Sequence, residues 1–122
     1  MQRRFLIAVL LTFAVCFTLL FATAAHAQTP RYSQAATKAA IRTEARRAGY
    51  GKAQTEALVT LAYRESRWHN WSSNHGKCLG TFQLARAMCV GHPWWSPVWN
   101  TRRAIVYIRH RYGTPIRALA HS

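Results

Sequence analysis

The sequence LAYRESRW (residues 61–68) ends an amphipathic pattern that decides the fold. Leu58 and Leu61 follow the i, i+3 spacing of one buried face, which predicts a helix from about Ala53 to Arg67. Continuing the same helical phase by one turn reaches Glu65. The pattern therefore predicts a carboxyl group at the edge of the core, at the end of an apolar stripe.

The remaining sequence predicts an all-α fold, because apolar residues recur with helical spacing and no segment alternates with the period of a strand. Residues 68–80 are rich in Ser, Asn, His and Gly, which indicates one long loop. We expect a compact, all-α helical domain with one long loop. Its further helices are predicted from Ser33 as N-cap to Gly49, over TFQLARAM (residues 81–88), from Asn100 as N-cap through Thr101 to Tyr112, and after Thr114-Pro115.

The N-terminus has the pattern of an export signal. Arg3 and Arg4 precede an apolar run from Phe5 to about Leu20, and Ala25-His26-Ala27 has the small-x-small pattern that signal peptidase cleaves. We predict a signal peptide over residues 1–27, a single domain over residues 28–122, and export to the periplasm, cell wall or medium. The length of the apolar run leaves an uncleaved membrane anchor as the alternative.

The net charge of the sequence is strongly positive. The chain has 17 Lys and Arg against three Glu and no Asp; without Arg3 and Arg4 the net charge is about +12. Such a surface attracts polyanions, namely nucleic acid, anionic lipid or the acidic polymers of a bacterial wall. Since we expect export, anionic wall or membrane surfaces are the predicted partners, and no specific nucleic acid is.

Two cysteines remain after cleavage, Cys78 and Cys89. In an oxidising compartment we expect them to form a disulfide, which would stabilise the fold by roughly 2 to 3 kcal/mol. The alternative is a zinc site, because His75-x-x-Cys78 and Cys89-x-x-His92 have zinc-like spacing. Export favours the disulfide, so neither a metal nor another cofactor is predicted.

Glu65 is the candidate catalytic residue. A glutamate at a helix end usually faces solvent, but here Trp68, Trp71 and Phe82 follow it and could form an apolar wall around it. A carboxyl group desolvated in this way has a raised pKa and can deliver a proton to a leaving group. Ordinary glycosidases need a second carboxylate. The sequence offers only Glu44 and Glu56, and neither is well placed, which favours chemistry with one carboxyl group.

Several motifs resemble the lytic transglycosylase domain of the lysozyme-like superfamily over about residues 57–121. In order they are Glu65-Ser66, Trp68, Gly80-Thr81-Phe82-Gln83, Tyr107-Ile108 and Arg111-Tyr112-Gly113. The resemblance implies a small lysozyme-like helical domain. It also implies cleavage of the peptidoglycan bond between N-acetylmuramic acid (MurNAc) and N-acetylglucosamine (GlcNAc), giving a 1,6-anhydro sugar. It also implies that Glu65 acts first as acid and then as base, that Ser66 and Gln83 line the sugar cleft, and that Tyr107 lies nearest Glu65. Trp68, Trp71 and Phe82 complete the predicted substrate-binding set.

The sequence departs from the family pattern in one place that concerns the chemistry. Many members have a later Ala-x-x-Tyr-Asn motif, whereas this sequence has Ala120-His121-Ser122. Two alternatives stay open: a lysozyme-like hydrolase that releases a reducing end, and a cationic wall-binding or membrane-binding protein without catalysis. Trp94, Trp95 and Trp99 could either fill the core or stack on sugars.

Overall fold

The structure, a computed structural model, describes residues 29–122. Within them the chain is mostly helical, which confirms the predicted all-α class apart from one very small hairpin. The helices are α2 (Gln34–Arg47), α3 (Lys52–Ser66), α4 (Arg86–Cys89), α5 (Pro97–Arg111) and α6 (Pro115–Ala120), and the strands are β1 (Cys78–Leu79) and β2 (Leu84–Ala85).

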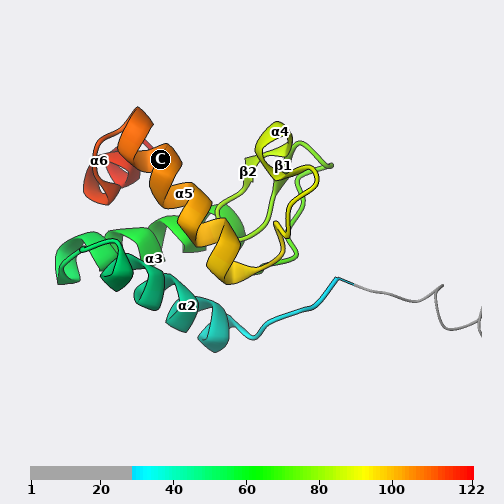
Figure 1. Cartoon of the computed structure of the whole chain (residues 1–122), viewed down its shortest axis with the longest axis horizontal. Coiled ribbons are helices and arrows are strands. Elements are labelled where there is room, and N and C mark those ends of the chain that lie inside the picture. Colours follow the sequence, from blue (N-terminus) through cyan, green and yellow to red (C-terminus); the bar gives the residue numbers. More distant parts are fainter. Residues whose placement is uncertain (1–28) are drawn as a thin grey trace, which may run out of the picture.

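Four helices surround one core (Figure 1). α2 packs against both α3 and α5, and α6 packs against α3 and α5. The antiparallel β1–β2 hairpin and α4 lie together in a separate corner of the fold, at the upper right of Figure 1. Both the helices and the hairpin region contribute large side chains to the core. They include Ile41, Leu58 and Ile105 from the helices and Leu79, Phe82 and Leu84 from the hairpin region.

The helix ends follow their local chemistry. The side chain of Ser33 accepts a hydrogen bond from the backbone N–H of Ala36 and caps α2, and Gly49 follows that helix in the left-handed region (φ +86°). Thr114 caps α6, with Pro115 at its first position. These ends were all predicted.

Two predicted boundaries were wrong. Residues 81–85 are not helical: Thr81 to Gln83 form a turn and Leu84 pairs with Leu79 in the hairpin, so that only Arg86–Cys89 is helical. α5 begins at Pro97 rather than Thr101, because Ser96 supplies the cap. A proline suits the first turn of a helix, where its missing N–H would have no partner.

Asn100, predicted as a helix cap, instead lies fully buried inside α5 and holds the hairpin region in place. Its Oδ1 accepts from the N–H of Phe82 at 2.9 Å, and its Nδ2 donates to the carbonyls of Trp94 (3.0 Å) and Leu79 (3.3 Å). A Cβ on Gly80 would stand 2.3 Å from that Nδ2, so only glycine fits there. α5 therefore fixes the turn that carries Phe82.

The predicted signal peptide, residues 1–27, lies outside the described residues. Among the helices of residues 29–122, none combines the length and apolar character that crossing a membrane requires.

Candidate active site

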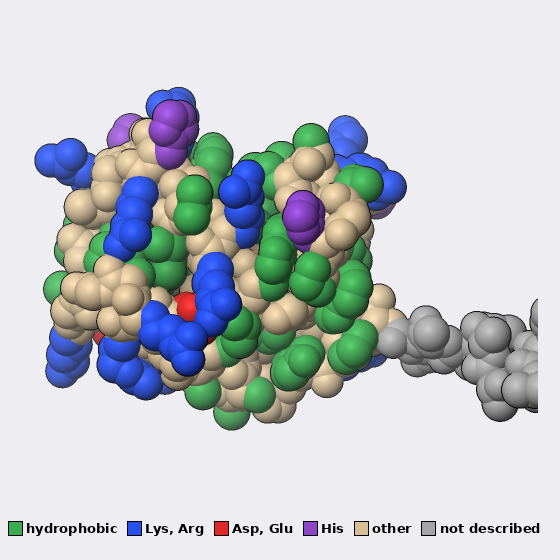
Figure 2. Space-filling model, in the orientation of Figure 1, with side chains coloured by type: hydrophobic (Ala, Val, Ile, Leu, Met, Phe, Trp, Pro, Cys, Tyr) green, Lys and Arg blue, Asp and Glu red, His purple; other side chains and the backbone are tan. Residues whose placement is uncertain are grey.

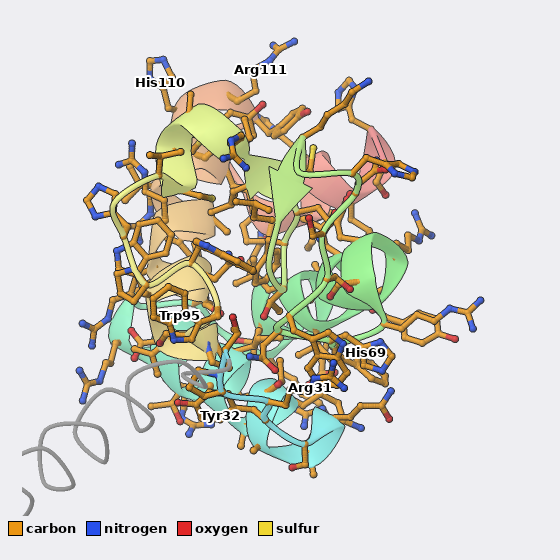
Figure 3. The ribbon with its side chains drawn as sticks, turned by 90° about the vertical axis from the view of Figure 1, so that its right-hand side faces the viewer. Arg31, Tyr32, His69, Trp95, His110 and Arg111 are labelled. Atoms are coloured by element: carbon orange, nitrogen blue, oxygen red, sulfur yellow. The ribbon has the colours of Figure 1, made fainter. Side chains whose placement is uncertain are left out.

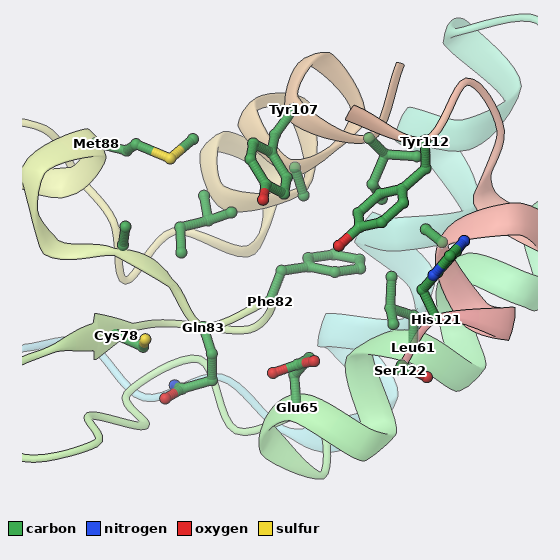
Figure 4. A pocket seen from close by; sticks show the side chains of 15 residues that line it. Leu61, Glu65, Cys78, Phe82, Gln83, Met88, Tyr107, Tyr112, His121 and Ser122 are labelled. Atoms are coloured by element: carbon green, nitrogen blue, oxygen red, sulfur yellow. The ribbon is translucent and has the colours of Figure 1, made fainter. Parts of the chain in front are cut away.

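A cleft of about 380 Å³ opens between the end of α3, the hairpin, α5 and α6 (Figure 4). Its lining is mostly apolar and aromatic, with a few polar groups converging on it, as is usual for a ligand site. The lining residues are Leu61, Glu65, Cys78, Phe82, Gln83, Leu84, Ala85, Met88, Ala104, Tyr107, Ile108, Tyr112, Ala118, His121 and Ser122.

Glu65 lies in the last turn of α3 and lines this cleft, as its helical phase predicts. Leu58, Leu61 and Ala62 of the same helix are buried, so the carboxyl group stands where the apolar face of α3 meets the cleft. Its carboxylate remains solvent-accessible and makes no hydrogen bond or ion pair with any residue of the described chain. Partial burial raises the pKa of Glu65 above its ordinary value of 4.5.

The other two glutamates are engaged elsewhere. The carboxylate of Glu44 is buried and accepts from Arg102 Nε at 2.7 Å, and Glu56 is paired with Arg42 at 3.2 Å on an exposed surface. Neither lines the cleft. Glu65 is therefore the one carboxyl side chain of residues 29–122 that is both in the cleft and without a cationic partner.

Gln83 faces Glu65 across the cleft (Figure 4). Its backbone has φ +49°, a conformation that non-glycine residues rarely adopt and that is enriched at functional sites. Its side-chain Nε2 donates to the carbonyls of Gly80 (2.9 Å) and Ser72 (3.1 Å). These bonds fix the amide, and its Oε1 accepts no hydrogen bond from residues 29–122, so it can accept one from a ligand.

Aromatic rings form another wall of the cleft. Phe82 is buried, whereas Tyr107 is 41% exposed and offers its ring to the cleft. Tyr112 meets Tyr107 edge to face, with centroids 6.2 Å apart, and stacks on His121 at 5.4 Å. Apolar ring faces with hydroxyl groups at their edges suit sugar rings, which present both C–H faces and hydroxyl groups.

Three predicted site residues lie outside this cleft. Ser66 is buried, and its hydroxyl donates to the carbonyl of Thr81 at 2.7 Å, so it joins α3 to the turn before Phe82. Trp68 packs against the core and donates from Nε1 to the carbonyl of Val59 at 2.9 Å.

Trp71 stacks on His69, with centroids 4.7 Å apart, and the guanidinium of Arg31 lies 4.9 Å from its ring centroid. Figure 3 shows Arg31 and His69 on the same side of the molecule. The structure thus brings together Glu65, Phe82, Gln83 and Tyr107 from the predicted set, and the wall beside Glu65 is built by Phe82 and tyrosines rather than by the two tryptophans.

Sequence reasoning missed Tyr112, His121 and Met88 as lining residues. Tyr112 could have been found, since it follows buried Ile108 by four residues and so continues the inner face of α5. No comparable spacing in the sequence indicates that His121 or Met88 lines the cleft. Their places depend on how α6 and α4 pack, which local spacing does not determine.

The predicted disulfide is absent: Cys78 and Cys89 are both free. Cys78, on β1, lines the cleft, whereas Cys89, at the end of α4, is fully buried with Sγ 3.7 Å from the carbonyl of Leu84. Burial, and secondarily the neighbouring Cys78, raise the pKa of the Cys89 thiol. No group of three or more His, Cys, Asp or Glu side chains that could hold a metal occurs in residues 29–122, and His92 stacks on Trp99.

The surface is dominated by basic side chains. Figure 2 shows Lys and Arg spread over one face with little acidic surface between them, beside a group of apolar side chains near a histidine. The formal net charge of the whole chain is +14. No family model, curated protein or solved structure matches this chain.

Proposed function

We propose that this protein is an exported lytic transglycosylase that cleaves the β-1,4 bond between MurNAc and GlcNAc in peptidoglycan. The observation that carries the proposal is the unpaired carboxyl group of Glu65 in an aromatic cleft, where no other carboxyl side chain of residues 29–122 is part of the lining. A mechanism that uses two carboxyl side chains would need an Asp or a second Glu in the cleft, and the lining supplies neither from residues 29–122. A reaction in which the substrate supplies the second group does not need one.

In the proposed first step, protonated Glu65 donates its proton to the glycosidic oxygen, the bond from that oxygen to C1 of MurNAc breaks, and GlcNAc leaves with a free 4-hydroxyl. The N-acetyl group of MurNAc stabilises the positive charge at C1. In the second step, the 6-hydroxyl of the same MurNAc attacks C1 and its proton passes to the Glu65 carboxylate. The product is 1,6-anhydro-MurNAc, and Glu65 is again protonated.

The raised pKa of Glu65 supports its role as proton donor, because a carboxylic acid that keeps its proton nearer neutral pH is a better general acid there. The fixed amide of Gln83 leaves Oε1 to accept from a sugar hydroxyl or N-acetyl N–H. Tyr107 and Tyr112 offer hydroxyl groups and ring faces on the other side of the cleft. The basic surface would hold the enzyme on the anionic wall.

Digestion of purified sacculi, with mass analysis of the released muropeptides, tests the proposal. A lytic transglycosylase releases anhydro ends, each one water lighter than the reducing end that a lysozyme-like hydrolase releases. Reducing ends alone would replace the proposal with hydrolysis. Binding to sacculi without any release would instead support the non-catalytic cationic protein.

A further inference from the structure

A second hollow of about 340 Å³ adjoins the cleft of Glu65. It is lined by Arg111, Tyr112, Arg117, Ala120 and His121. Tyr112 and His121 line both spaces, so their stacked rings form the wall between them. The two spaces are therefore separated by one layer of side chains.

The hollow is lined by two arginines. Arg111 is the last residue of α5, where Figure 3 shows it projecting from the fold, and its guanidinium carbon lies 5.4 Å from the ring centroid of Tyr112. Neither Arg111 nor Arg117 donates a side-chain hydrogen bond within residues 29–122, and no carboxyl side chain lines the hollow.

The two arginines flank the turn between α5 and α6, and both line the hollow. Gly113 has φ +86°, and a Cβ at this position would stand 3.5 Å from Arg117 Nη1, so the guanidinium of Arg117 lies close against the turn that follows Arg111. Two guanidinium groups beside a Tyr and a His offer several donors to one anion. Guanidinium groups favour carboxylates and phosphates because they can bind two oxygens at once.

We propose that this hollow binds a carboxylate of the peptide carried by the muramic acid in the cleft. The inference rests on the proposed function, because it uses the identity of the sugar. MurNAc bears a lactyl ether whose carboxyl group is linked to a short acidic peptide. That peptide starts at the sugar beside Glu65, and each residue extends it by at most about 3.5 Å. The proposal places a carboxylate of its first residues beyond the rings of Tyr112 and His121. The pocket would then favour glycan whose acidic peptides are still in place.

Binding of MurNAc-L-Ala-D-Glu tests the proposal, since this single sugar has no glycosidic bond to cleave. Its matched ligand is the same compound with both carboxyl groups amidated. By calorimetry or NMR titration at low salt, the wild-type protein should bind the carboxylate form about tenfold or more tightly than the amide form. Equal affinities in the wild-type protein would overturn the proposal without any variant being needed.

The variant Arg111→Gln/Arg117→Gln should bring the ratio of the two affinities close to one. The matched control is Arg46→Gln/Arg47→Gln, which removes the same charge from the exposed end of α2, outside both spaces, and should keep the ratio. An equal loss in both variants would mean that net charge, not the hollow, selects the ligand. Glycerol phosphate is the competing anion, and tighter binding of it than of the carboxylate ligand would overturn the assignment to the peptide.

The two proposals fail in different ways. If sacculi release no product while the carboxylate ligand binds through Arg111 and Arg117, the hollow is an anion site and the lytic function is wrong. If anhydro muropeptides appear while the two ligands bind equally, the lytic function stands and the peptide site is wrong.

Discussion

Arg102 on α5 donates two hydrogen bonds to the carboxylate of Glu44 on α2, at 2.7 Å from Nε and 3.3 Å from Nη2. The carboxylate side chain is only 5% exposed, whereas Arg102 is 55% exposed. The pair therefore joins two core helices through a buried anion and a solvated cation.

We expect Arg102→Met to lower the thermal unfolding midpoint more than Glu44→Gln does. The first change leaves a buried carboxylate without its partner, whereas the second leaves a neutral amide that can still accept from Arg102. Thermal unfolding of both variants at neutral pH measures the difference. Equal losses, or a larger loss for Glu44→Gln, would contradict this account of the pair.

Glu65→Gln should lower the rate of sacculus cleavage by at least about 10²- to 10⁴-fold, because glutamine has the same shape and no proton to transfer. The protein should still fold and bind sacculi. Glu56→Gln is the matched control: it removes the same charge from an exposed ion pair and should change stability by less than about 1 kcal/mol and cleavage little. Cleavage that survives Glu65→Gln would remove this residue from the mechanism.

The pH dependence follows from the raised pKa of Glu65. In the proposed mechanism Glu65 must carry a proton when it meets the glycosidic oxygen, so kcat/KM should fall as pH rises through that pKa, with a midpoint above the ordinary value of 4.5. A rate profile between about pH 4 and pH 8 locates the midpoint. A midpoint at or below the ordinary carboxyl value would contradict the proposed environment.

The same pKa predicts a change in stability. The folded state holds the Glu65 proton more tightly than the unfolded state, so this contribution is fully present below the unfolded pKa and is lost as pH rises through the folded pKa. The stability of the wild-type protein relative to Glu65→Gln should therefore decline across that window. Urea unfolding of both proteins at a series of pH values measures it, and a difference that does not vary with pH would refute the shift.

Asn100→Ala should destabilise the fold by about 3 kcal/mol, because it leaves a buried N–H and two carbonyls without their partner. We also expect cleavage to fall, since the turn carrying Phe82 and Gln83 loses its support from α5. Asn74→Ala is the control, because Asn74 is exposed in the loop and its side chain makes no hydrogen bond within the described chain. Urea unfolding and sacculus digestion of both variants provide the two measurements.

The helical part of the fold could be predicted because its determinants are local. Caps such as Ser33 and Thr114 act on their own next turn, and the phase that carries Glu65 into the cleft follows from Leu58 and Leu61. The hairpin could not be predicted, because its strands of two residues each are too short to show alternation. They are held by Asn100, which lies 18 residues after Phe82.

The candidate site, too, could be predicted from the sequence only in part. Phe82 and Gln83 lie in the cleft, but Trp68 turns toward the core because Arg67 and Trp68 both have positive φ (52° and 60°) after α3 ends. Apolar and aromatic composition alone does not distinguish a tryptophan that fills the core from one that lines a cleft. The cysteines show a similar limit, since sequence spacing does not reveal that one of them lies in the cleft and the other inside the core.

The free thiol of Cys78 gives the cleft a built-in chemical reporter. Because this sulfur lines the same space as Glu65 while Cys89 is fully buried, a small alkylating reagent should modify Cys78 and spare Cys89 in a folded protein that lacks the predicted signal peptide. A glycan lying in the cleft should slow that modification. The mass gained by intact protein over time would then measure how much of the cleft is occupied, with no product having to form.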